Sequence, residues 1–190
     1  LYYNKEDYNK AKEYYEQSLK YYLDKYSKKH QNYSTGLINL SNVSTKRGDY
    51  DKAEKYLLEA LQIREEVYGV EHNEYADMQV RLGYLYYEMG DYKKSEEYYQ
   101  DALDTRFELY GKNHKEYANS LVKLGWYHKN LGNYKKSEEY YLEALSIRKE
   151  LYGENHPNYR SLFASIGNLY FDKEDYNKAK EYYEQSLKYY

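Results

Sequence analysis

A 42-residue period runs through the whole chain and limits its fold more than any other feature. Residues 5–22 (KEDYNKAKEYYEQSLKYY) recur letter for letter as residues 173–190, an offset of 168 residues, or four times 42. Between these copies one tyrosine of an acidic or amide turn returns at each step, at Tyr8, Tyr50, Tyr92, Tyr134 and Tyr176. Self-similarity at a fixed period of this length is typical of arrays of stacked helical or strand units. The sequence therefore predicts a repeat architecture.

Landmarks within each repeat predict where its two helices begin and end. Asp or Asn ahead of an apolar-periodic run can cap a helix start, so a longer helix, helix B, is expected to begin at about residues 7, 49, 91, 133 and 175. A glycine accepts the left-handed conformation that ends a helix, which places helix B ends near Tyr68, Tyr110 and Tyr152. A short Gly-x-x-His loop follows. The only proline, Pro157, lies in this loop, where a helix is not expected to continue. The second helix, helix A, is expected over roughly 33–46, 75–89, 117–131 and 159–173.

The expected helices are amphipathic and carry small residues where two helices must approach. In residues 75–89 the apolar stripe has helical spacing, with Met78, Leu82, Leu85, Tyr86 and Met89. Small residues recur in helix A at Ser41, Gly83, Gly125 and Gly167, and in helix B as Ala or Ser at positions 53, 95, 137 and 179. One such helix pair cannot bury its apolar face alone, whereas stacked pairs build a continuous core. The expected fold class is therefore all-α: a superhelical solenoid of stacked antiparallel helix pairs.

Composition excludes several function classes. The chain has no cysteine, which rules out a disulfide scaffold, a thiolate zinc site and a cysteine nucleophile. Its formal net charge is −3, and its lysines alternate with glutamates, so no nucleic-acid partner is expected. No apolar run approaches the length of a membrane span and no signal peptide is visible, so no membrane partner and a cytoplasmic location are expected. Because the chain begins at Leu1, it is interpreted as a fragment or a processed product, and its repeats as a fragment of a longer array.

Catalytic and cofactor motifs are absent from the sequence. There is no phosphate-binding loop, nucleophile elbow, zinc-protease motif or dinucleotide fingerprint, and the adjacent glutamates lie on solvated helix faces. We therefore expect no catalytic residue, no cofactor and no enzyme activity. His30, His72, His114 and His156 recur at the repeat period, which favours a structural role in the loop, such as bonding a nearby carbonyl, over a metal site. His128 is expected to be a satisfied polar residue or a packing residue. The 33 tyrosines are interpreted as packing residues, not as stacking platforms for bases.

These landmarks together resemble the tetratricopeptide repeat. The pattern Leu82-Gly83-x-x-Tyr86, then Gly90-Asp91-Tyr92, then Ser95-x-x-x-Tyr99-x-x-Ala102, follows that family. Its usual repeat has 34 residues, and the longer period here is similar to the 42-residue class of kinesin light chains and many bacterial arrays. The resemblance covers the whole chain. It implies a single repeat domain over residues 1–190, with units at about 1–32 (partial), 33–74, 75–116, 117–158 and 159–190.

The resemblance also implies a binding surface. In this family the inner faces of the A helices line a concave groove that holds an extended peptide or a partner helix. Carried over position by position, the groove residues are Asn39, Asn42, Arg81, Tyr84, Tyr87, Lys123, Trp126 and Asn168. Some relatives clamp a terminal carboxylate with Asn, Lys and Arg, and Asn42, Arg81 and Lys123 form a partial version. Ile38 and Asn119 stand where further clamp residues are expected, so a complete clamp is not predicted.

Two functional hypotheses follow from the sequence. The first is a protein-interaction scaffold that binds a protein or peptide ligand in the groove, where preordered side chains lower the entropic cost of binding. The second is a structural array segment that self-associates end to end, or by exchange of terminal helices, through its sequence-matched ends. The unit at 1–32 lacks most of helix A, so its helix B is expected to have an uncovered flank, whereas solenoids normally need polar caps.

Overall fold

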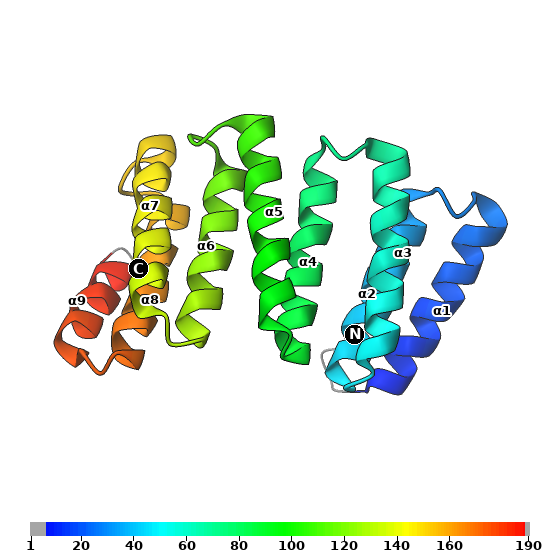
Figure 1. Cartoon of the computed structure of the whole chain (residues 1–190), viewed down its shortest axis with the longest axis horizontal. Helices are drawn as coiled ribbons and strands as arrows, with labels where there is room; N and C mark the ends of the chain where they lie inside the picture. Colours follow the sequence, from blue (N-terminus) through cyan, green and yellow to red (C-terminus); the bar gives the residue numbers. More distant parts are fainter. Residues whose placement is uncertain (1–6, 189–190) are drawn as a thin grey trace. The chain divides into compact units, whose positions relative to one another are not determined.

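The structure is a computed structural model that describes residues 7–188 of the chain. Within these residues it contains α-helices and no β-strand (Figure 1). The helices are α1 (Tyr8–Lys25), α2 (Gln31–Lys46), α3 (Tyr50–Tyr68), α4 (Asn73–Met89), α5 (Tyr92–Tyr110), α6 (Lys115–Asn130), α7 (Tyr134–Tyr152), α8 (Pro157–Asp172) and α9 (Tyr176–Leu187). The odd-numbered helices are the B helices and the even-numbered ones the A helices. The B helices begin directly after the predicted caps, and α3, α5 and α7 end at the predicted tyrosines.

The A helices begin two residues earlier than predicted. Pro157 is the first residue of α8 and therefore does not lie in a loop, so its interpretation as a loop residue was wrong. Proline is well suited to this position, because the first N–H of a helix has no partner within the helix and the fixed φ of proline is already helical. Gln31, Asn73 and Lys115 occupy the same first position in α2, α4 and α6.

The period-spaced histidines are the N-caps of the A helices. In each case the histidine Nδ1 accepts a hydrogen bond from the backbone N–H two residues further on, at 3.1–3.2 Å. Each imidazole also stacks on the last tyrosine of the preceding B helix, or on Tyr26 after α1, with ring centroids 4.1–4.8 Å apart. The predicted structural role is confirmed, but the bonded group is an N–H and not the carbonyl that was expected. The cap explains why each A helix starts directly after its histidine.

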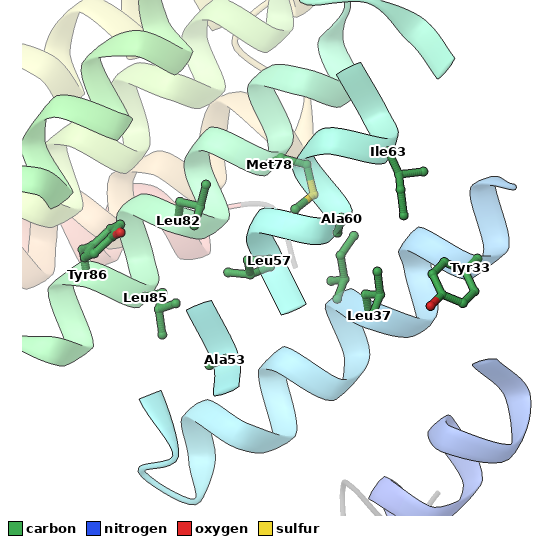
Figure 2. Close-up of a cluster of buried hydrophobic side chains, with 11 residues drawn as sticks. Tyr33, Leu37, Ala53, Leu57, Ala60, Ile63, Met78, Leu82, Leu85 and Tyr86 are labelled. Carbon is green, nitrogen blue, oxygen red and sulfur yellow. The ribbon is translucent and has the colours of Figure 1, made fainter. Parts of the chain in front are cut away.

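The described residues form two compact units, which divide between Thr105 and Arg106. In the first unit, α2, α3 and α4 enclose a cluster of buried side chains (Figure 2). Helix α3 packs against both α2 and α4, and it contributes Ala53, Leu57, Ala60 and Ile63 to this cluster from one face. Tyr33 and Leu37 come from α2, and Met78, Leu82, Leu85 and Tyr86 come from α4. This cluster contains the apolar stripe predicted for residues 75–89, except that Met89 is only partly buried.

The second unit repeats this arrangement with α6 to α9. Its buried side chains include Leu121, Leu124 and Tyr127 of α6, Tyr141 and Ala144 of α7, Leu162, Ile166, Leu169 and Tyr170 of α8, and Ala179 of α9. His128 of α6 is buried among them and stacks on Tyr140, with ring centroids 5.5 Å apart and planes 4° from parallel. The expected packing role of His128 is therefore confirmed.

A glycine of helix A touches a tyrosine ring of helix B in three of the repeats. A Cβ added to Gly125 would lie 2.7 Å from the Tyr141 ring, and the same contact occurs between Gly83 and Tyr99 and between Gly167 and Tyr183. The remaining repeat has Ser41 in place of glycine and Leu57 in place of tyrosine, and both are buried. Leucine is smaller than tyrosine and leaves room for the serine side chain. The two positions therefore change together within this one chain.

The first prediction concerns this paired contact. We expect Gly125→Ala to lower the free energy of unfolding by about 1–3 kcal/mol, although alanine favours helix, because the added methyl overpacks against a buried, rigid ring. The double variant Gly125→Ala with Tyr141→Leu reproduces the Ser41–Leu57 type of pair and should recover part of this loss relative to Tyr141→Leu alone. Urea unfolding of the four chains measures the coupling. Additive effects of the two substitutions would contradict the assignment.

The second prediction concerns the histidine caps. His72→Ala should destabilise α4 by about 1 kcal/mol, because the N–H of Glu74 loses its acceptor. His72→Asn keeps an acceptor at the cap and should lose less. Urea unfolding measures the stability, and amide hydrogen exchange at Glu74 reports the cap directly. Equal losses in the two variants would show that the ring stacking on Tyr68, and not the cap, carries the stabilisation.

Candidate functional site

A cavity of about 190 Å³ opens between the A helices of the first unit. Three predicted groove residues line it: Asn39 and Asn42 from α2 and Arg81 from α4. Its other lining residues are Thr35, Ile38, Arg64, Glu74, Asp77 and Met78. Asn39 and Asn42 are one helical turn apart on α2, which gives them the same side of the helix. The structure therefore brings together the part of the predicted surface that lies in α2 and the middle of α4.

The side chains of Asn39, Asn42 and Arg81 have no hydrogen bond or ion pair with any residue in the range 7–188. Asn42 and Arg81 are exposed and Asn39 is half-buried. Each asparagine amide offers both a donor and an acceptor, and the Arg81 guanidinium offers a planar set of donors that matches a carboxylate. The cavity thus presents hydrogen-bonding groups that the fold itself does not use.

Buried Arg64 forms the floor of this cavity and fixes its walls. Arg64 extends from α3 towards α2. Its Nε donates to Ser34 Oγ of α2 at 2.8 Å, and one Nη donates to Thr35 Oγ1 of α2 at 3.2 Å. The other Nη forms an ion pair with Glu74 at the start of α4. One guanidinium therefore ties three helices together. Because Glu74 is paired with Arg64, its charge is compensated within the fold.

An equivalent arginine recurs in the next two repeats, as Arg106 and Arg148, and was missed from the sequence. In the second unit, Arg106 donates to Ser120 Oγ at 2.9 Å, and Arg148 donates to the Asn158 carbonyl at 2.8 Å and to Asn119 Oδ1 at 3.0 Å. Burial lowers the pKa of Arg148. The spacing of 42 residues between these arginines was the available signal. It was overlooked because charged residues in helix B were interpreted as solvated.

The two tyrosines predicted for the groove in the first unit do not line the cavity. Tyr84 lies on α4 with 36% of its surface exposed. Tyr87 is half-buried, and its ring is tilted against Tyr92 with the centroids 5.7 Å apart. Burial raises the pKa of the Tyr87 phenol, with smaller contributions from Tyr92 and Glu88. Tyr87 therefore contributes to packing within its own unit.

The remaining three predicted residues lie in the second unit and differ from one another. Lys123 on α6 is exposed and makes no hydrogen bond or ion pair with the described residues. Trp126, also on α6, is half-buried. Asn168 on α8 is exposed, but its Oδ1 accepts a hydrogen bond of 2.7 Å from the Tyr183 hydroxyl. The carbonyl side of this amide is thus already used, which the sequence did not reveal because Tyr183 belongs to another helix.

The part of the chain that the structure describes offers no other obvious chemistry. Over residues 7–188, no group of three or more His, Asp or Glu side chains is placed to hold a metal ion. None of the helices in the same range is long and apolar enough to cross a membrane.

Comparison with known families identifies the repeat. The model of the tetratricopeptide repeat matches residues 1–66, 34–106, 74–150 and 127–190, which together span the chain. The chain belongs to the tetratricopeptide repeat family. The resemblance seen in the sequence is thereby confirmed, and with it an all-α repeat solenoid. No curated protein matches the chain.

Solved structures of other tetratricopeptide proteins share this fold. BtubC (BKLC) from P. vanneervenii has a TM-score of 0.77 and 24% identity over 95% of this chain and 72% of its own. The Q17M form of the nearly identical TPR-like repeats of a Podosopora anserina protein, described as a kinesin light chain, has a TM-score of 0.75 and 17% identity, over 98% of this chain and 88% of its own. A Rap protein complexed with Competence and Sporulation Factor has a TM-score of 0.75 and 18% identity, over 98% of this chain and 50% of its own. At these identities the likeness establishes the fold.

Family membership also gives a coarse function. Tetratricopeptide repeat proteins bind protein partners, and their fold is typically a non-catalytic scaffold. Fold alone does not define a partner, because one architecture hosts many unrelated roles. Which partner this tetratricopeptide chain binds depends on the side chains at its own binding site.

The third prediction tests the buried arginine. Arg64→Met keeps much of the volume but removes all donors, and we expect the free energy of unfolding to fall by about 2–3 kcal/mol, because charge-assisted hydrogen bonds to α2 and α4 are lost. Arg64→Lys should recover only part of this loss, since an ammonium cannot reproduce the planar set of contacts. The control is Lys55→Met on the exposed side of α3, which should change stability by less than about 0.5 kcal/mol. Urea unfolding compares the three.

Proposed function

We propose that the chain is a protein-interaction scaffold that binds an extended peptide at the cavity between α2 and α4. The observation that carries this proposal is the set of three polar side chains, Asn39, Asn42 and Arg81, that line the cavity and have no partner among the described residues. Unused hydrogen-bonding groups on a rigid wall are well suited to a ligand that supplies the missing partners. Arg64 supports that wall from beneath.

The three side chains suit a peptide that carries a carboxylate. In the proposed complex Arg81 pairs with a carboxylate of the peptide, from an acidic side chain or the chain terminus, because a guanidinium matches its geometry with two parallel hydrogen bonds. Asn39 and Asn42 bond the peptide backbone, since each amide both donates and accepts. Ile38 and Met78 supply the apolar part of the lining. Asp77 lines the same cavity and disfavours a second acidic group beside the first.

The remaining predicted residues extend this proposal along the chain. Tyr84 and Tyr87 stay proposed ligand contacts in the first unit, and Lys123, Trp126 and Asn168 stay proposed ligand contacts in the second. Lys123 has the strongest support among them, because its ammonium is exposed and has no ion-pair partner among the described residues. Asn168 has the least, because its oxygen is bonded by Tyr183. The likeness to a Rap protein complexed with Competence and Sporulation Factor agrees with ligand binding by this fold.

A second candidate function is self-association through the sequence-matched ends. It is favoured by the identity of residues 5–22 with residues 173–190, which gives both ends of the chain the same helix. No catalytic role, nucleic-acid partner, cofactor or membrane contact is part of either proposal, and the expected cytoplasmic location is retained in both. The first candidate concerns the A helices and the second the terminal B helices, so the two are tested separately.

The fourth prediction tests peptide binding at the cavity. A peptide library displayed with free and with amidated C-termini is probed with the whole chain, and the best binder is titrated by fluorescence anisotropy. We expect Arg81→Ala to weaken binding by about tenfold or more, because a charge-assisted hydrogen bond is lost. Asn42→Ala should weaken it by a smaller factor. Added salt should weaken the parent chain more than the Arg81→Ala variant.

The matched control for this experiment is Lys55→Ala. It removes one positive charge from an exposed position of α3 and does not line the cavity. The control should bind as the parent does. If peptides bind equally to the Arg81→Ala, Asn42→Ala and Lys55→Ala chains, the proposed site is wrong. If Lys123→Ala and Trp126→Ala are the only damaging changes, the ligand lies on the second unit instead.

A further inference from the structure

The same helix sequence docks by opposite sides at the two ends of the chain. Residues 8–20 of α1 and residues 176–188 of α9 and its cap are identical. In the first unit, α1 packs on α2 through Leu19, whose Cδ1 lies 2.8 Å from the place where a Gly36 Cβ would be. Arg47, which follows α2, donates to Asn9 Oδ1 at 2.8 Å. Helix α1 is therefore held on its α2 side.

Helix α9 is held on the other side of the same sequence. The Tyr183 ring packs against Gly167 of α8, and Tyr182 stacks on Tyr170 with the ring centroids 5.3 Å apart. The equivalent of Leu19 on this helix is Leu187, which has 65% of its surface exposed and is the most exposed large apolar side chain among the described residues. The equivalent of Asn9 is Asn177, which is exposed and makes no hydrogen bond with the described residues.

A cavity of about 460 Å³ lies beside Leu187, between α8 and the end of α9. Its lining includes Pro157, Ser161 and Ala164 of α8 and Ser186 and Leu187 of α9. Within the first unit, α3 shows that a B helix can be covered on both sides at once, since it packs between α2 and α4. Leu61 is the α3 equivalent of Leu187, and it is partly buried against that core. The uncovered side of α9 thus has the chemistry of an A-helix docking surface.

We infer that α9 of one chain docks on α2 of a second copy and displaces that copy's α1. In this exchange Leu187 takes the place of Leu19 against Gly36 of the second copy, and Asn177 takes the place of Asn9 beside its Arg47. Exchange requires no new binding surface on α2, because the incoming helix has the sequence that α2 already binds. The inference rests on the self-association proposed above and adds which helix is replaced and which contacts are remade.

A simple stacking of two intact ends does not make these contacts. It would place α9 of one chain against α1 of another, so two B helices would meet without the A helix that separates them in every described repeat. Exchange removes the surplus B helix and restores the alternation. Because the two surfaces in contact are different, each added copy leaves one of each kind uncovered, and the assembly grows as an open chain unless its geometry closes.

Two effects of opposite sign set the concentration at which exchange occurs. Helix α1 is attached to α2 by a short loop, which gives it an effective concentration of about millimolar or more and favours the closed monomer. Among the described residues, α9 packs on α8 and keeps this contact during exchange, whereas α1 packs on α2 and loses its contact, and an isolated helix of its length is marginal in water. Weakening the α1 contact should therefore shift the balance towards exchange at lower protein concentration.

The fifth prediction compares the same substitution at the two equivalent leucines. Leu187→Ala should raise the protein concentration needed for association about tenfold or more, because the incoming helix loses its anchor. Leu19→Ala should lower that concentration by a similar factor, because only the resident helix is weakened. Light scattering of the whole chain across protein concentration measures both. Helical content by circular dichroism confirms that α9 and the core remain folded in each variant.

A cysteine lock separates exchange from stacking. The chain has no cysteine, and a Gly36 Cβ would lie 3.9 Å from Leu19 Cβ, within the range of a disulfide. The oxidised Leu19→Cys, Gly36→Cys chain should stay monomeric at concentrations where the parent associates, and reduction should restore association. A second chain, Gly36→Cys with Leu187→Cys, should form disulfide-linked oligomers in a glutathione buffer. Gly36→Cys with Lys180→Cys is its control, because Lys180 is exposed on α9 and has no counterpart contact on α2.

Each outcome decides the inference. Loss of association in the oxidised lock, together with more linked oligomer from the Leu187→Cys chain than from the Lys180→Cys chain, supports exchange. Association that persists in the oxidised lock overturns exchange and leaves end-to-end stacking as the form of self-association. If neither the parent nor the Leu19→Ala chain associates up to about millimolar concentration, exchange and the proposed self-association are both wrong. None of these results bears on the proposal that a peptide binds at Arg81, which is tested separately.

Discussion

The contact between a helix A glycine and a helix B tyrosine sets the spacing on which each repeat depends. Where Tyr141 lies on Gly125, there is no room for a side chain on helix A, and the two backbones come close enough for Ser137 to donate to the Gly125 carbonyl at 2.7 Å. Leu121, Leu124 and Ala144 of the same two helices are buried as completely as Tyr141, as close packing of the interior requires. The buried arginines act at the other end of the helix pair, where the apolar contacts give way to the helix starts.

Much of this fold could be predicted from the sequence because its signals are local and repeat. The starts of the B helices depend on an Asp or Asn cap, and their ends on a glycine with positive φ, so both are visible within a few residues. The starts of the A helices were placed two residues late, because histidine was not recognised as a cap and Pro157 suits both a loop and the first helical position. The direction of the histidine hydrogen bond could not be predicted, since the imidazole can both donate and accept.

The candidate site was predicted less completely, because its chemistry depends on contacts between helices. Asn39, Asn42 and Arg81 were found by position alone, and they do meet at one cavity. Arg64 was missed because a buried arginine needs partners on two other helices, and a helix B sequence shows none of them. The hydrogen bond of Asn168 could not be predicted for the same reason, since its donor Tyr183 lies fifteen residues away on another helix. Position in a repeat predicts which side chains face a groove, while availability depends on neighbours that the repeat does not specify.

One repeat has Ser41 and Leu57 where the other repeats have glycine and tyrosine. This difference limits how a gene that encodes such an array can change. Repeats of the same length favour unequal recombination between gene copies, which adds or removes whole repeats. A crossover between repeats keeps each helix A with the helix B that matches it in volume. A crossover inside a repeat can join Ser41 to a tyrosine from a later copy, and the hybrid then carries a side chain with no space to occupy. Whole units are therefore the pieces in which this array can be lengthened or shortened without loss of its packing.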